Sequence, residues 1–199
     1  MAELSTERVT KALRDIKIDR DSKLLTHINS CVRCGLCANS CIYYNAEPDP
    51  RFIPAKKVEI VSSVIKHYMT RTGRILPAFS GTRKLEEKTI EEMVDLLFGS
   101  CTLCDRCTAH CSIGVDIGYL VRVGRNILAN LEEVPATLQS TVDAALQTGN
   151  NMAISNEDFV DTLEWLEEDL QMEVDDENAT IPLDQPGKHI LYTLNPREP

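Results

Sequence analysis

Aromatic side chains and long apolar runs are scarce in this chain of 199 residues. Phe, Tyr and Trp make up 5% of it, and the single tryptophan is Trp165, so we expect a mostly aliphatic core. No uninterrupted apolar stretch approaches the roughly 18 residues that a membrane-spanning helix needs. The N-terminus, Met-Ala-Glu-Leu-Ser-Thr-Glu-Arg, lacks the apolar segment of a secretory signal. The sequence therefore predicts a cytoplasmic protein with no direct membrane span.

Positive charge is missing from a long stretch near the C-terminus. No Lys or Arg occurs between Asn126 and Gly187, although fifteen of the 31 acidic residues lie there and the whole chain has a net charge of −10. Because a basic footprint for phosphate is missing, we expect no nucleic-acid partner. The acidic stretch is either a solvated helix face that continues into a linker or a docking surface for a basic patch. Both interpretations stay open.

All eight cysteines fall in two runs with the same spacing, C-x2-C-x2-C-x3-C. This is the ligand run of bacterial-type ferredoxins, in which the fourth cysteine of each run binds the other cluster. On that rule two [4Fe–4S] clusters are expected. The first would be held by Cys31, Cys34, Cys37 and Cys111, and the second by Cys101, Cys104, Cys107 and Cys41.

Two other uses of the cysteines are weaker. A disulfide framework needs an oxidising compartment, and no secretory signal is present. A structural zinc site usually takes two ligands from each of two knuckles, whereas three thiols here come from one loop. Inside the runs, Gly35 and Asp105 stand at the same place, and both residue types tolerate the positive φ that such a loop needs. The usual proline after the last cysteine is replaced by Ile42 and Ser112.

The regions around the runs have helical patterns. Residues 42–100 are expected to form helices and loops, with one helix starting at Pro54 and ending near Gly73, and another starting at a capping box on Thr89. Asp116 is the expected N-cap of the helix after the second run. We therefore predict an all-α fold with two cluster-binding loops between helices, flanking helices at both ends, and a short β-strand at residues 189–194. The predicted divisions are an N-terminal helical extension (1–24), the cluster-binding domain (25–135), an acidic helical extension (136–178), and a linker with the terminal strand (179–199).

Residues for other chemistry are missing. The sequence has no nucleophile–base pair, no glycine-rich phosphate loop and no flavin fingerprint. No plant-type C-x4-C-x2-C run is present, which the iron–sulfur subunits of succinate dehydrogenases and fumarate reductases would need. We therefore expect an electron carrier that is not itself catalytic.

The paired runs and their long helical spacer resemble the α-helical ferredoxins, and more narrowly the C-type subunits of heterodisulfide reductases and the N-terminal part of the fused D-type subunits. The resemblance covers about residues 25–135 and implies an electron-transfer subunit with the eight cysteines as ligands. It implies as partners a B-type catalytic subunit and an upstream donor or acceptor that contains flavin or iron–sulfur clusters. Similar modules serve glycolate and glycerol-3-phosphate oxidising complexes. The alternatives are an iron–sulfur module of such a complex or of a succinate- or fumarate-type oxidoreductase, and, less favoured, a zinc-binding structural protein. The CCG motifs of the catalytic subunits are missing here, so this chain should not reduce a disulfide by itself.

Overall fold

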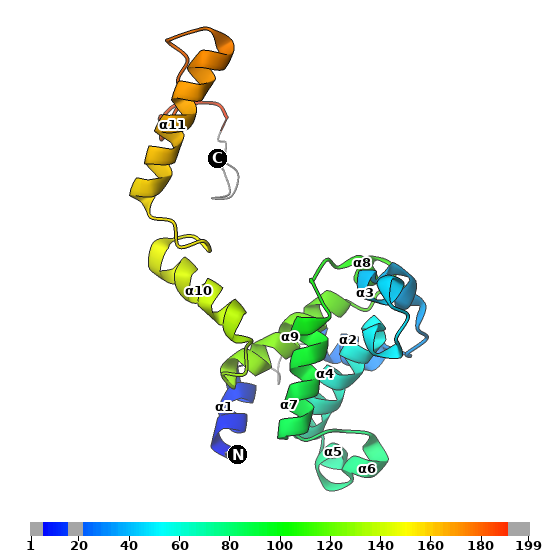
Figure 1. Cartoon of the computed structure of the whole chain (residues 1–199). Coiled ribbons are helices and arrows are strands. Elements are labelled where there is room, and N and C mark those ends of the chain that lie inside the picture. Colours follow the sequence, from blue (N-terminus) through cyan, green and yellow to red (C-terminus); the bar gives the residue numbers. More distant parts are fainter. Residues whose placement is uncertain (1–5, 16–21, 191–199) are drawn as a thin grey trace. The chain divides into compact units, whose positions relative to one another are not determined.

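The computed structural model describes residues 6–15 and 22–190 (Figure 1). The chain divides into two compact units, Met1–Pro135 and Ala136–Pro199. All regular secondary structure in the described residues is helical, and no strand occurs among them. The predicted all-α class is therefore confirmed. Of the predicted terminal strand, His189 and Ile190 are described and are not in a strand, and residues 191–194 lie outside the described part.

The first unit contains nine α-helices and three short helical turns within its described residues (Figure 1). The helices are α1 (Thr6–Asp15), α2 (Ser22–Ser30), α3 (Ile42–Ala46), α4 (Pro54–Met69), α5 (Arg71–Ile75), α6 (Pro77–Ser80), α7 (Glu87–Val94), α8 (Arg106–Ala109) and α9 (Ile117–Asn130). The turns are η2 (Leu36–Ser40), η3 (Pro50–Phe52) and the π-type η4 (Asp95–Gly99).

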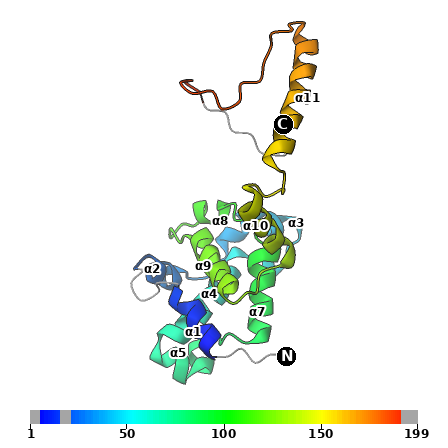
Figure 2. The ribbon, with the colours of Figure 1, turned by 90° about the vertical axis from the view of Figure 1, so that its left-hand side faces the viewer.

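Helices α4 and α9 form the centre of this unit, and Figure 2 shows α7 beside them. Gly124 lets them approach, because a Cβ at this position would lie 2.7 Å from Val61 and 2.6 Å from Leu97. No Phe, Tyr or Trp is buried among the described residues, which confirms the expected aliphatic core. Each buried aliphatic side chain contributes about 1.5–3 kcal/mol relative to exposure. Several of them are fully buried: Val58, Val61, Val64, Ile65, Met93, Leu97, Leu120, Val121, Ile127 and Leu128.

The start of α9 is fixed as the sequence predicts. The Oδ1 atom of Asp116 accepts a hydrogen bond of 2.8 Å from the N–H of Tyr119, which is an N-cap. The same residue pairs with Lys23 of α2 at 2.9 Å, and its N–H donates to Nδ1 of His27 at 3.2 Å. Asp116 therefore ties α2 to the start of α9.

Two predicted helix boundaries are wrong. Gly73 does not end α4; it lies inside α5, because Thr70 is extended and its Oγ1 accepts a 3.0 Å hydrogen bond from the N–H of Gly73. Thr89 does not start α7, which begins at Glu87. Leu85 is 2% exposed and its N–H donates to the hydroxyl of Tyr68, so the chain is anchored just before the helix and turns at once.

The second unit contains α10 (Ala136–Thr148) and α11 (Asn156–Val174). Ser155 caps α11 by accepting a hydrogen bond of 3.0 Å from the N–H of Asp158. The segment after α11 returns along it, since the N–H of Ile181 donates to Glu167 at 2.6 Å. Leu163 is the one buried residue among residues 136–190. This unit therefore has little core of its own.

Candidate metal centre

The two cysteine loops share one backbone conformation. In each loop, the residues two and four places after the first cysteine have positive φ: Arg33 (58°) and Gly35 (81°), then Leu103 (56°) and Asp105 (56°). Positive φ was expected at Gly35 and Asp105 and is confirmed there. It could not be expected at Arg33 and Leu103, because those residue types rarely adopt it. Where a left-handed residue follows a right-handed one, successive N–H groups turn toward one side and make a concavity for an anion.

The first loop encloses a cavity of about 370 Å³ of empty space, open solvent included. Three thiols of the first run line it, together with the last thiol of the second run, from Cys111. Ala55, at the start of α4, and Ile117, at the start of α9, line the same cavity. The three thiols from one loop are Cys31, Cys34 and Cys37.

The second loop encloses a similar cavity, with about 400 Å³ of empty space, open solvent included. Its lining contains Cys101, Cys104 and Cys107 of the second run and Cys41 of the first. The structure thus brings the eight predicted ligands into two groups of four, and each group takes its fourth member from the other run. The role of these thiols as ligands stays a prediction.

Both long helices begin at the cavities. Pro54, at the first position of α4, lines the second cavity, and the next residue, Ala55, lines the first. Ile117 begins α9 and lines both. The N-terminus of a helix carries a partial positive charge and unpaired N–H groups, so it favours a negative group nearby.

Backbone N–H groups also reach the sulfur atoms. The N–H of Val115 donates to Sγ of Cys111 at 3.4 Å. Burial raises the pKa of the Cys37 thiol, while a hydrogen bond from the N–H of Ala55 acts in the opposite direction. Burial, helped by the charge of Cys101, raises the pKa of Cys107 to about 11. Burial therefore favours the neutral form of the Cys37 and Cys107 thiols until a metal displaces the proton.

The donor set fits an iron–sulfur cluster. Four thiols surround each cavity, and thiolate is the ligand type of such clusters. Within residues 6–15 and 22–190, no group of three or more His, Cys, Asp or Glu side chains is placed to hold a single metal ion. The N–H donors and helix N-termini described above provide the electrostatic surroundings that a negatively charged cluster needs.

The second loop is fixed against α9 by side chains that sequence reasoning missed. Gly118 lies so close to Asp105 that a Cβ there would overlap the carboxylate. The N–H of Gly118 also donates to Oγ1 of Thr108 at 3.0 Å. From the next turns of α9, Arg125 donates to the carbonyl oxygens of Leu97 (2.8 Å) and Cys101 (2.6 Å). No local pattern marks these residues, because their partners are 10–28 positions away in the chain.

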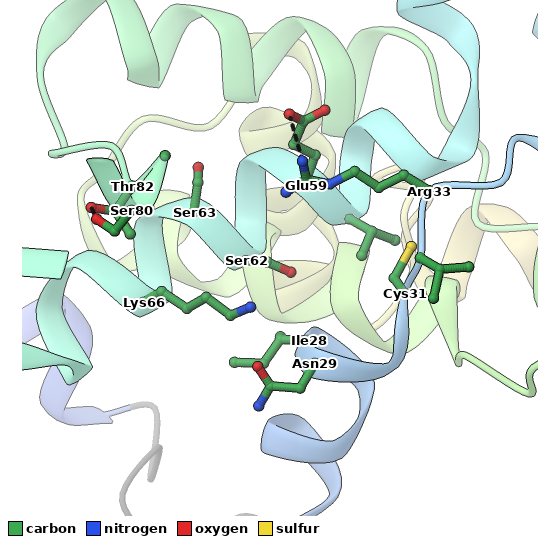
Figure 3. A pocket seen from close by; sticks show the side chains of 13 residues that line it. Ile28, Asn29, Cys31, Arg33, Glu59, Ser62, Ser63, Lys66, Ser80 and Thr82 are labelled. Atoms are coloured by element: carbon green, nitrogen blue, oxygen red, sulfur yellow. Dashed lines mark hydrogen bonds and ion pairs between the residues drawn. The ribbon is translucent and has the colours of Figure 1, made fainter. Parts of the chain in front are cut away.

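The first loop has a more open surrounding. A polar hollow lies beside Cys31, and Figure 3 shows Ser62 and Lys66 of α4 pointing into it. The buried hydroxyl of Ser62 has no hydrogen-bond partner among the described residues. Arg33 pairs with Glu59 at 3.7 Å along the same wall. Three exposed apolar side chains line the first cavity itself: Val32 (67% exposed), Leu36 (52%) and Ile113 (47%).

Comparison with known proteins identifies this region. Residues 27–115 match the 4Fe–4S dicluster domain family. The chain is 31% identical over 145 residues to the Hdr-like menaquinol oxidoreductase iron–sulfur subunit 2 of Archaeoglobus fulgidus, which is 72% of this chain and 26% of that protein. It is also 31% identical over 137 residues to the corresponding iron–sulfur subunit of Archaeoglobus profundus, covering 69% of this chain and 24% of that protein.

A third relative is the D subunit of the dihydromethanophenazine:CoB–CoM heterodisulfide reductase of Methanosarcina barkeri, with 25% identity over 150 residues, 75% of this chain and 35% of that protein. The aligned part of this chain thus spans about a quarter of the length of the two Archaeoglobus relatives. No solved structure matches the chain. None of the described helices has the length and apolar character to cross a membrane. The match to the 4Fe–4S dicluster domain family thus includes both cysteine loops, and the similar proteins are iron–sulfur subunits of Hdr-like menaquinol oxidoreductases and D subunits of heterodisulfide reductases.

Proposed function

We propose that this chain is the electron-transfer subunit of a heterodisulfide-reductase-like complex and relays single electrons through two [4Fe–4S] clusters. The observation that carries the proposal is the sorting of eight thiols into two cavities, each with three cysteines from one run and one from the other. Four ligands per cavity match what one cubane takes. In this proposal the first cluster is held by Cys31, Cys34, Cys37 and Cys111, and the second by Cys101, Cys104, Cys107 and Cys41.

The residues of the chain would hold the clusters and tune them. Bound in the cavities, the clusters supply reversible one-electron chemistry. The N–H groups of Ala55 and Val115 donate toward sulfur, which favours the more negative, reduced form. The starts of α4 and α9 act in the same sense. Crossed ligation ties each loop to the other, so the distance between the clusters would be fixed by covalent bonds.

Electrons must arrive from one protein and leave to another, because the sequence has no site for a substrate. We propose a B-type catalytic subunit as one partner and a flavin- or iron–sulfur-containing subunit as the other, in the cytoplasm. The relatives, which are subunits of Hdr-like oxidoreductases, support this assignment of partners. Val32, Leu36 and Ile113 form an exposed apolar rim at the first cavity, which supports docking of a redox subunit there. Residues 25–135 would be the cluster-binding domain and residues 136–178 an acidic helical extension.

Metal and sulfide analysis tests this function most directly. Protein purified without oxygen should contain about eight iron atoms and eight acid-labile sulfides per chain, with two EPR signals on reduction. A colourless protein with zinc and no sulfide would end the proposal.

Two matched variants test the crossed ligation. Cys41→Ser should damage the cluster of the second loop, and Cys111→Ser should damage the cluster of the first loop. EPR spectra of the two variants, compared with Cys104→Ser and Cys34→Ser, assign each signal to a cavity. If Cys41→Ser instead resembles Cys34→Ser, each run binds its own cluster and the crossed assignment is wrong.

A further inference from the structure

Lys57 is the most deeply buried charged side chain in the described part of the protein. It lies in the first turns of α4, is 2% exposed and lines the second cavity. No Arg, Asp or Glu and no other Lys is buried among the described residues. A lysine is almost never fully buried unless it is paired.

The protein offers this ammonium group little compensation. Its one hydrogen bond to a described residue is long, 3.5 Å from Nζ to the carbonyl oxygen of Phe52. It forms no ion pair with a described carboxylate; the neighbouring Lys56, by contrast, pairs with Glu59 at 3.0 Å. Burying an unpaired charge is strongly unfavourable. The structure therefore calls for an anion near Nζ. The same cavity is lined by four thiols, which become anionic when they bind a metal, and by Asp105, whose carboxylate is already paired with Arg122 at 3.3 Å.

The first cavity has no corresponding charge. The one cationic residue in its lining is Arg33, whose side chain is 64% exposed and is paired with Glu59. Solvent screens such an exposed charge far more than a buried one. The second side also has Arg125, which is partly buried and donates to the carbonyl oxygen of Cys101. Backbone N–H groups donate to sulfur at both cavities, from Ala55 and Val115 at the first and from Thr108 at the second. The two sides therefore differ in buried positive charge and not in the presence of such donors.

This difference has a definite redox consequence. A cubane bound by four thiolates is negatively charged, and reduction adds one more negative charge. A buried ammonium therefore stabilises the reduced form more than the oxidised form. The reduction potential of the cluster that lies nearer to the ammonium group is therefore raised.

We propose that Lys57 is the internal counter-cation of the second cluster and holds its reduction potential above that of the first. Electrons that enter at the apolar rim of the first cavity then pass downhill to the second cluster and leave from there. This inference rests on the proposed function, since it needs clusters in both cavities.

The test is a redox titration followed by EPR, with each signal assigned by the cysteine variants. In the unsubstituted protein the second cluster should be reduced at the higher potential. Lys57→Met keeps the length of the side chain and removes its charge. At a fixed solution potential it should lower the ratio of reduced to oxidised second cluster at least tenfold, which is about 59 mV for a one-electron couple. The first cluster should shift less.

Lys56→Met is the matched control. It removes the same charge from the next position of α4, where the side chain is 52% exposed, and should move neither ratio by more than about threefold, because solvent screens it. Lys57→Arg keeps the charge and should keep the second potential. Equal shifts from Lys56→Met and Lys57→Met, or a second cluster that is reduced at the lower potential in the unsubstituted protein, would overturn the inference.

A second outcome of Lys57→Met is loss of the second cluster. In that case Lys57→Arg and Lys57→Gln decide: loading restored by arginine and not by glutamine supports the counter-cation, and equal behaviour of the two overturns it. A failure of the proposed function looks different, because the unsubstituted protein would then contain no clusters at all.

Discussion

The two cysteine loops have one spacing and one backbone conformation but different surroundings. The second loop is fixed by Gly118 and Arg125 of α9, the former through its N–H to Thr108 of the loop, and has the buried Lys57 beside its cavity. The first loop adjoins a polar hollow and an exposed apolar rim. In the proposed function, the shared features would hold a cluster, and the differing features would set its potential and its access to a partner. On this proposal a repeated motif would specify the cofactor twice, while the surroundings would give the two copies different tasks.

The largest difference is expected from alanine at the glycines of the two loops. Gly118→Ala places a Cβ inside the space of the Asp105 carboxylate and should force that side chain away from α9. We expect it to cost about 1–3 kcal/mol and to lower the iron content by up to half. Gly35→Ala is the matched variant of the first loop: its Cβ meets no atom within 4 Å, so only the strain of φ = 81° remains, about 1 kcal/mol. Urea unfolding and iron analysis measure both. Equal losses would show that the second loop is no more tightly fixed than the first.

Cluster assembly should depend on pH most strongly at the second cavity. Burial raises the pKa of Cys107 to about 11, well above the ordinary value near 9. A raised pKa favours the neutral thiol in the folded chain, so ligation must remove a proton, and the fraction of thiolate that can bind iron falls as the pH falls. Reconstitution with iron and sulfide should therefore be slower at pH 7 than at pH 9, by up to tenfold per pH unit. Cys107→Ser removes this group, and the remaining cluster of the first cavity should then load with a weaker dependence. A pH dependence that is unchanged in Cys107→Ser would contradict this cause.

The apolar rim gives a smaller effect that concerns only the partner. Leu36→Glu places a charge on the rim of the first cavity, where the side chain is 52% exposed. We expect roughly a tenfold loss in the rate of electron transfer from the upstream subunit, since charge at an interface core weakens binding by about 1 kcal/mol or more. Cluster content should not change. Ile42→Glu, at the second cavity and 43% exposed, is the control. An equal loss in that variant would place the entry of electrons at both cavities.

Much of this arrangement can be predicted from the sequence, and the rest has a clear reason for being hidden. The cysteine spacing, the cap at Asp116 and the positive φ at Gly35 are local properties, so a single segment reveals them. The role of Lys57 is not local, because it depends on α4 starting at the second cavity. The sequence does not distinguish Lys57 from its neighbour Lys56, which is also a lysine but has a side chain that is 52% exposed. Gly73 misled because the hydroxyl of Thr70 ends α4 earlier than a glycine stop would.

The smallest effect is expected from an exposed charge near the second loop. Arg122 of α9 pairs with Asp105 at 3.3 Å, with the two side chains 51% and 44% exposed. Because an exposed ion pair contributes little, Arg122→Gln should change the free energy of unfolding by less than about 1 kcal/mol. At a fixed solution potential, the ratio of reduced to oxidised second cluster should change by less than about threefold in this variant. This holds although Arg122 is cationic and its partner Asp105 belongs to the loop. Redox titration of Arg122→Gln beside Lys57→Met therefore separates the effect of burial from that of charge alone. If the two variants shift the second cluster equally, distance and not burial sets the difference between the two loops.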